Sequence, residues 1–150
     1  MTSPIITIKF KKLTPEAVIP GYAHPGDAGA DLVAIGAHTL QPLQRLAIPT
    51  GLAAEIPQGY EMQVRPKSSL ALKHGITVLN TPGTVDAGYR GEIKVILINL
   101  GQFAFEINPG QRIAQIIIAP VLQAEFVETA QLNDSQRGEG GFGSTGTTYG

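Results

Sequence analysis

Residues 92–99 read EIKVILIN, a run of β-branched and other apolar residues with only two charged members. Such a run is typical of a β-strand, because Val and Ile fit the pleated, half-buried surface of a sheet. Residues 75–79 (GITVL) form a second run of the same kind. These two segments are the clearest strand candidates in the chain, and they indicate a β protein.

Working outward from these runs, short apolar segments recur at intervals of about ten residues. Residues 5–10, 51–57 and 59–65 are predicted strands, and the Pro-Gln-Gly sequence between the last two signals a turn. Residues 113–119 (IAQIIIA) are almost wholly apolar, so we expect both faces of this strand to be buried, within the chain or against a partner. Only residues 68–74 (SSLALKH) are typical of a helical turn or two, with a serine as N-cap.

Length and composition fit one all-β domain, because 150 residues suffice for a core and 18 Gly with 11 Pro supply many turns. Many short strands in one domain predict a sandwich, jelly roll or barrel. We assign this domain to residues 1–132. Residues 133–150 are polar and rich in glycine, so we expect them to form a flexible C-terminal arm.

The totals also exclude several classes of protein. A formal net charge of -1 without a long basic block argues against direct binding to nucleic acid. The lack of cysteine excludes disulfides, thiol catalysis and thiolate zinc sites. No apolar run approaches the ~18 residues of a membrane span, and residues 1–10 lack the layout of a signal peptide. The sequence therefore predicts a soluble cytoplasmic protein.

Five polar segments carry residues that suggest chemistry. Residues 25–32 (PGDAGADL) hold Asp27 and Asp31, which are candidate cation or capping groups. A plain Asx turn is the alternative for Asp27, and a buried structural carboxylate is the alternative for Asp31. Residues 65–71 (RPKSSLA) combine a cation, two hydroxyls and helix-start N–H groups into a candidate anion site, although Ser-capped short helices are common.

The third segment, residues 80–92 (NTPGTVDAGYRGE), places Asp86 and Tyr89 in a tight hairpin. An Asp in this position can activate water, and a Tyr can stack on a ring or a sugar. Both residues are equally ordinary in β-turns, so the segment alone leaves the two readings open.

The fourth segment, residues 110–115 (GQRIAQ), introduces Arg112 and Gln115 at the start of the apolar strand. An Arg that enters a buried region needs a carboxylate partner, and Asp31 or Asp86 can serve, so Arg112 is predicted to be structural. Gln115 needs hydrogen-bond partners among apolar neighbours, and a bound water or a phosphate oxygen would provide them.

The fifth segment, residues 137–146 (RGEGGFGSTG), is half glycine. Its N–H groups, together with Arg137 and the hydroxyls of Ser144 and Thr145, can surround an anion. It is not a Walker P-loop, because the Lys is missing and no helix can follow. A flexible linker is the alternative, but the aromatic Phe142 argues for a contact.

In this order, the five segments resemble the five motifs of the trimeric dUTP pyrophosphatase (dUTPase) family, and they cover most of the chain. The resemblance implies a β jelly roll with one short helix that assembles as a homotrimer with shared active sites. It also implies Mg2+-dependent hydrolysis of dUTP to dUMP and pyrophosphate, which limits uracil incorporation into DNA and supplies dUMP for dTMP synthesis. In this family the C-terminal arm closes over the nucleotide of a neighbouring subunit.

The resemblance implies a role for each matching residue in the hairpin. Asp86 would deprotonate the water that attacks the α-phosphorus and would contact the sugar 3'-hydroxyl. Tyr89 would pack under the deoxyribose and leave no room for a 2'-hydroxyl. The uracil slot would be lined by Asn80 and the backbone of Gly83, Thr84 and Val85, with Lys94 nearby.

The other motifs would hold the triphosphate. Phosphate oxygens would meet Lys67, Ser68 and Ser69, and Gln115 would bind the α-phosphate and the water. Asp31 would reach Mg2+ through water, because this ion keeps several waters and is held mainly by phosphates. From the arm, the resemblance adds Arg137, Ser144 and Thr145 at the γ-phosphate and Phe142 over the uracil, with Gly143 as a further substrate-binding residue.

The second motif departs from the family pattern. The family usually reads Arg-Ser-Gly where this chain has Lys67, Ser68 and Ser69. Lysine keeps the charge but loses the bidentate fork, and Ser69 adds a Cβ where glycine is usual. Since neither change removes the attacking group, we expect activity to survive.

Three other readings remain. A dCTP deaminase shares the fold, and Glu92 would be its acid or base, although the hairpin sequence fits the uracil enzyme better. A non-catalytic nucleotide sensor could dispense with Asp86 or the arm, and both are present. A structural capsid-like jelly roll is disfavoured by the dense polar loops.

Overall fold

The computed structural model describes residues 5–149, so the outer ends of the segments predicted at residues 1–132 and 133–150 lie outside it. It contains short strands and a single helix within that range. In chain order, these elements are β1 (Lys9–Lys12), β2 (Gly29–Val33), β3 (His38–Leu40), β4 (Arg45–Glu55), β5 (Tyr60–Arg65), α1 (Ser68–His74), β6 (Ile76–Val78), β7 (Gly83–Val85), β8 (Glu92–Asn99), β9 (Phe105–Ile107) and β10 (Arg112–Pro120).

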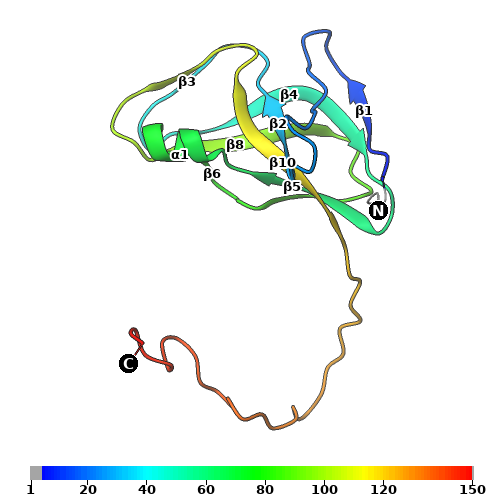
Figure 1. Cartoon of the computed structure of the whole chain (residues 1–150), viewed down its shortest axis with the longest axis vertical. Coiled ribbons are helices and arrows are strands. Elements are labelled where there is room, and N and C mark those ends of the chain that lie inside the picture. Colours follow the sequence, from blue (N-terminus) through cyan, green and yellow to red (C-terminus); the bar gives the residue numbers. More distant parts are fainter. Residues whose placement is uncertain (1–4, 150) are drawn as a thin grey trace.

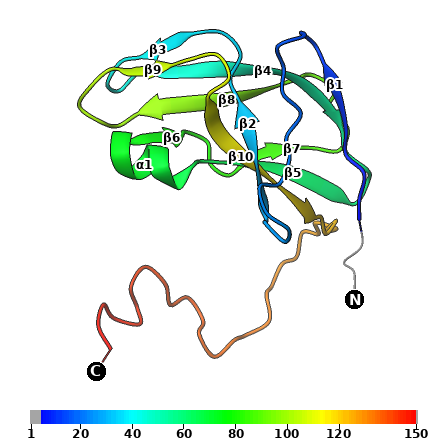
Figure 2. The same ribbon diagram turned by 45° about the horizontal axis from the view of Figure 1, so that its top comes forward.

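The strands form two four-stranded antiparallel sheets, in the orders β1-β4-β8-β6 and β2-β10-β5-β7 (Figure 1). Strands β3 and β9 form a separate two-stranded sheet beside one end of β4 and β8 (Figure 2). The prediction of an all-β fold with one short helix is therefore confirmed.

The core lies between the two larger sheets. Along β8, buried Ile93, Val95 and Leu97 alternate with residues that are more exposed, as expected of a strand with one face on a core. The fully buried apolar side chains come from both of the larger sheets and from β3 and β9. The largest are Leu32, Leu40, Ile48, Leu52, Met62, Ile76, Leu97, Ile107 and Ile113.

Several predicted elements coincide with observed ones. The bounds of β8 and α1 are those predicted. Strand β5 begins one residue later than predicted, and β6 and β10 differ from prediction by one residue at each end. The first predicted strand, residues 5–10, was placed too early, because β1 begins where Lys9 pairs with Glu55 of β4. The predicted strand at residues 51–57 overlaps only the second half of the longer β4 and runs two residues beyond its end.

The predicted serine N-cap of α1 was wrong. Ser68 already lies inside the helix, and the N-cap is Lys67, which has extended backbone angles and makes no side-chain cap hydrogen bond. Gly75 ends the helix in the left-handed conformation, and its N–H donates to the carbonyl oxygens of Leu70 and Ala71.

Strand β10 is less buried than its apolar sequence suggests. Ile113, Ala114 and Ile116 are buried, whereas Ile117 and Ile118 are half-buried in the single chain. After β10, the N–H of Val121 still donates to the carbonyl oxygen of Gly59 at 2.9 Å. Residues 122–139 are exposed, and Figures 1 and 2 show this segment running away from the sheets.

One helix occurs in the part of the chain that the structure describes, and it is too short to cross a membrane.

Candidate active site

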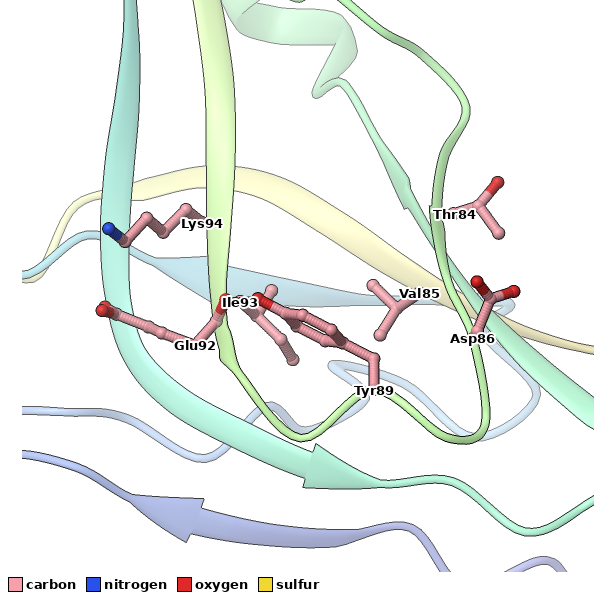
Figure 3. A pocket seen from close by; sticks show the side chains of 7 residues that line it. All are labelled: Thr84, Val85, Asp86, Tyr89, Glu92, Ile93 and Lys94. Atoms are coloured by element: carbon pink, nitrogen blue, oxygen red, sulfur yellow. Dashed lines mark hydrogen bonds between the residues drawn. The ribbon is translucent and has the colours of Figure 1, made fainter.

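The loop that joins β7 to β8 borders a pocket of about 420 Å³, which we call the hairpin pocket after the sequence motif (Figure 3). The predicted tight hairpin was wrong, because β7 pairs with β5 in one sheet and β8 pairs with β4 and β6 in the other. Gly83, the first residue of β7, pairs with Val64 of β5. The Asn80 side chain lies beside Gly83, and a Cβ added to Gly83 would lie 3.4 Å from Asn80 Nδ2. Asn80 itself is exposed and does not line the pocket. The residues that line it are Thr84, Val85, Asp86, Tyr89, Glu92, Ile93 and Lys94.

Tyr89 is held in the hairpin pocket by its own turn. Its N–H donates to the carbonyl oxygen of Asp86 at 3.1 Å, and its hydroxyl donates to the carbonyl oxygen of Glu92 at 2.8 Å. The ring lies over Gly91, where an added Cβ would come within 2.6 Å of the ring carbon Cζ. Glycine at position 91 is therefore required for this placement, which leaves the Tyr89 side chain 47% exposed.

Asp86 lies on the β7 side of the hairpin pocket, while Glu92 and Lys94 lie on the β8 side (Figure 3). In residues 5–149, no side-chain hydrogen bond or ion pair engages the Asp86 carboxylate. Asp86 also lines a second, smaller pocket of about 270 Å³ beside Gly59 and Val121. An exposed carboxylate without a protein partner can accept a proton or hold a water molecule.

A second group of polar residues, which we call the Asp31 cluster, contains Asp31, Lys67, Arg112 and Gln115. Lys67 Nζ lies 2.5 Å from Asp31 Oδ1, and Arg112 Nε lies 3.5 Å from Asp31 Oδ2. Gln115 Nε2 donates to the carbonyl oxygen of Pro66 at 3.0 Å. Of the two carboxylates considered for Arg112, the structure pairs it with Asp31.

The position of β10 explains how the Asp31 cluster forms. This strand lies between β2 and β5, so that Gln115 is paired with Asp31 on one side and with Arg65 on the other. Lys67 follows two residues after Arg65, within reach of Asp31. The hydroxyl-bearing Ser68 and Ser69 are exposed at the start of α1 next to this cluster.

The donor set limits how a metal ion can bind. Across residues 5–149, no group of three or more His, Asp or Glu side chains could hold a metal ion, and the Asp31 carboxylate is already shared by two cations. This set fits an Mg2+ ion that takes most of its oxygen ligands from a bound phosphate chain and from water, and it does not fit a protein cage.

The predicted arm residues lie apart from both groups. They make local turns. Arg137 Nε donates to the carbonyl oxygen of Gly140 at 2.6 Å, and the N–H of Ser144 donates to the carbonyl oxygen of Gly141 at 3.0 Å. The Phe142 side chain is fully exposed. Exposed Gly143 and Thr145 belong to the same segment. Within one chain, the predicted site residues thus fall into three separate places.

One contact in the hairpin pocket has no local signal in the sequence. Glu92 Oε2 accepts a hydrogen bond from the N–H of Gly51 at 3.0 Å, which fixes the start of β8 against β4. This contact could have been predicted only from the pairing of β4 with β8, and neither segment reveals that pairing in its own sequence.

The structure of residues 5–149 is a β-sandwich in which a pocket joins an unpaired carboxylate to an aromatic ring, and comparisons with known proteins give the enzyme class and the family. A family model described as dUTPase matches residues 15–146. The chain therefore belongs to the dUTPase family, whose enzymes are dUTP diphosphatases.

Relatives and solved structures agree with this assignment. The chain is 59% identical to a deoxyuridine 5'-triphosphate nucleotidohydrolase of Nautilia profundicola, covering 93% of this chain and 98% of that protein. It is 54% identical to the protein of the same name from Clostridium kluyveri, covering 91% and 96%. A mutant dUTPase of Staphylococcus bacteriophage 80alpha, solved with dUpNHpp, has a TM-score of 0.84 and 27% identity, covering 94% of this chain and 99% of that one.

Proposed function

We propose that this chain hydrolyses dUTP to dUMP and pyrophosphate, with Mg2+ bound to the substrate phosphates. The observation that carries the proposal is the hairpin pocket, in which a free carboxylate, Asp86, and a partly exposed aromatic ring, Tyr89, line one space of about 420 Å³. The family membership supports the choice of dUTP as substrate. The Asp31 cluster supports a phosphate-binding role, because it supplies cations beside exposed hydroxyls.

In this proposal Asp86 is the general base. Its carboxylate takes a proton from a water molecule, and the water oxygen attacks the α-phosphorus while the bond to the pyrophosphate oxygen breaks. A positioned general base typically contributes about 10²–10⁴-fold in rate. The lack of a competing ion pair on Asp86 in the described residues supports this role.

Tyr89 selects the sugar in this proposal. Its ring packs under the deoxyribose, so that a 2'-hydroxyl would meet the ring and UTP would be rejected. The hydrogen bond from Tyr89 to Glu92 and the packing over Gly91 keep the ring from moving aside. The backbone of residues 83–85, with Asn80, reads the uracil, and Lys94 lies near that slot.

The phosphate chain is held by the Asp31 cluster together with Ser68 and Ser69. Lys67 and Gln115 would contact phosphate oxygens, and Asp31 would help to hold Mg2+ through water. Bound Mg2+ supplies positive charge that offsets the charge of the triphosphate. Asp31 also orients Lys67 and Arg112, since both cations share its carboxylate.

A complete site requires more than one copy of the chain in this proposal. The three separate places in one chain support a homotrimer in which each site is shared, with the exposed arm extending to a neighbouring copy. Arg137, Ser144 and Thr145 bind the γ-phosphate there, and Phe142 stacks over the base. Ordering the arm over the bound nucleotide excludes bulk water from the reaction.

The test is to incubate the protein with dUTP and with each standard deoxynucleoside triphosphate, with Mg2+ or with an excess of chelator. We expect pyrophosphate to be released from dUTP and from none of the other nucleotides, and only when Mg2+ is present. Ammonia release from dCTP would instead identify a deaminase. Binding of dUTP without release of either product would identify a nucleotide sensor.

A further inference from the structure

The pairing of β4 with β8 is interrupted beside the hairpin pocket. Pro49 pairs with Lys94 and Ala53 pairs with Glu92, so that three residues of β4 face the single residue Ile93. Such a bulge cannot continue the regular ladder of main-chain hydrogen bonds, and its polar groups need other partners.

Two side chains provide those partners. The hydroxyl of Thr50 donates to the carbonyl oxygen of Ile93 at 2.5 Å and lies 3.3 Å from the N–H of Leu52. The carboxylate of Glu92 accepts the N–H of Gly51 at 3.0 Å. A hydrogen bond from a main-chain N–H to an ionised carboxylate is stronger than one to a neutral acceptor.

The backbone of Gly51 is closely packed where it meets Glu92. Its φ is +70°, in the region that favours glycine, and an added Cβ would lie 3.0 Å from both Ala17 Cβ and Thr14 Oγ1. Its carbonyl oxygen accepts the N–H of Leu13 at 2.7 Å on the other side. The packing and this hydrogen bond hold the N–H of Gly51 in place, and the Glu92 carboxylate accepts a hydrogen bond from it.

Glu92 makes a second contact through its main chain. Its carbonyl oxygen accepts the hydroxyl of Tyr89 at 2.8 Å, so one residue connects the β4 bulge to the aromatic ring of the hairpin pocket. We propose that Glu92 is a positioning residue that holds Tyr89 in place through its carboxylate bond to Gly51, and that it thereby sets discrimination between deoxyribose and ribose. This inference rests on the proposed function of Tyr89.

The same geometry argues against a role for Glu92 in proton transfer. The residue is half-buried, and its carboxylate is occupied by the N–H of Gly51. A positioning role needs only a hydrogen-bond acceptor of the same length, whereas an acid or base needs an ionisable group. Glu92→Gln separates the two roles, because the amide oxygen can still accept the N–H.

The test compares three variants: Glu92→Gln, Glu92→Ala and the matched control Thr50→Val. Thr50→Val removes hydrogen bonds of the same bulge without touching Glu92 or Tyr89. For each variant, kcat/KM is measured for dUTP and UTP, dUMP and UMP binding is measured by calorimetry, and thermal unfolding is recorded. Hydrogen exchange over residues 86–92 without nucleotide reports how firmly the turn is held.

We expect Glu92→Ala to lower the preference for dUTP over UTP by about tenfold or more and to speed exchange over residues 86–92. Glu92→Gln should keep both properties near those of the wild type. Thr50→Val should lose stability but keep the preference.

Three results would overturn the proposal. In Glu92→Ala, these results are unchanged hydrogen exchange over residues 86–92 or an unchanged preference for dUTP over UTP. In Thr50→Val, it is a loss of that preference equal to the loss in Glu92→Ala. Loss of turnover in Glu92→Gln at normal dUMP binding would instead show an acid or base. If the wild type neither hydrolyses dUTP nor binds dUMP, the proposed function fails, and hydrogen exchange still tests the contact itself.

Discussion

Asp31 and Lys67 form a close ion pair between β2 and the start of α1, with Lys67 Nζ 2.5 Å from Asp31 Oδ1. Both side chains are about three-quarters buried, at 25% and 24% exposed. The lysine side chain is flexible, and the contact with the Asp31 carboxylate holds its end in place. Asp31 therefore orients the ammonium group of Lys67.

The first prediction concerns this lysine. Lys67→Met should raise the KM for dUTP by about tenfold or more, since hydrogen bonds to charged groups contribute about 1.5–3 kcal/mol. Binding of dUMP, which lacks the outer phosphates, should change little. Steady-state kinetics and calorimetry measure the two quantities. Lys67→Arg is the control and should keep activity, and equal weakening of dUTP and dUMP binding by Lys67→Met would contradict the assignment.

The second prediction concerns the general base. Asp86→Asn keeps the shape of the side chain but removes its basicity, so kcat should fall by about 10²–10⁴-fold while dUTP still binds. Single-turnover hydrolysis and calorimetry with a non-hydrolysable analogue separate the two effects. Glu16→Gln, at an exposed carboxylate that lines neither of the two pockets that Asp86 lines, is the control. Near-normal turnover in Asp86→Asn would remove Asp86 as the base.

The third prediction concerns the arm. Deletion of residues 137–150 should lower dUTP hydrolysis by about two orders of magnitude, because the bound nucleotide would stay open to water. The unfolding temperature should not change, since the described arm residues make only local contacts. A shorter deletion, of residues 147–150, leaves the motif intact and should keep activity. If the longer deletion unfolds the protein, the arm is part of the architecture.

The fourth prediction concerns stability at the end of β8. Asn99 is fully buried, and its side chain donates to the carbonyl oxygens of Leu40 and Phe103 and accepts the N–H of Gly101. Asn99→Ala should lower the free energy of unfolding by about 3 kcal/mol, because it leaves these main-chain groups without partners. Urea denaturation measures the change.

The control for this variant is Asn108→Ala, at an exposed site, which should stay within about 0.5 kcal/mol of the wild type. A similar, small change in both variants would mean that water replaces the buried hydrogen bonds of Asn99.

The sequence predicted elements whose signals are local. Strand β8 and helix α1 were found because their residue patterns are complete within eight and seven residues. The start of β4 was missed, since Pro49 and polar neighbours hide a strand that the partner β8 stabilises. A strand that is defined by its pairing leaves a weak pattern in its own sequence.

The candidate site shows the same division. Asp86 and Tyr89 were singled out because both stand in one short hairpin sequence. The partner of Arg112 stayed open between two carboxylates, because the choice depends on β10 lying beside β2. Glu92 and Gly51 are 41 residues apart in the sequence and meet at a bulge, so no local sequence pattern predicts their contact.

The exposed arm also makes the protein sensitive to proteases. Arg137 is the last basic residue of the sequence, and it lies in a segment that makes no contact with the sheets among the described residues. Trypsin acts on such mobile, exposed segments far faster than on folded strands. A single cleavage after Arg137 would release Phe142, Ser144 and Thr145 together and leave the β-sandwich whole, so brief digestion would yield a stable protein with an open site.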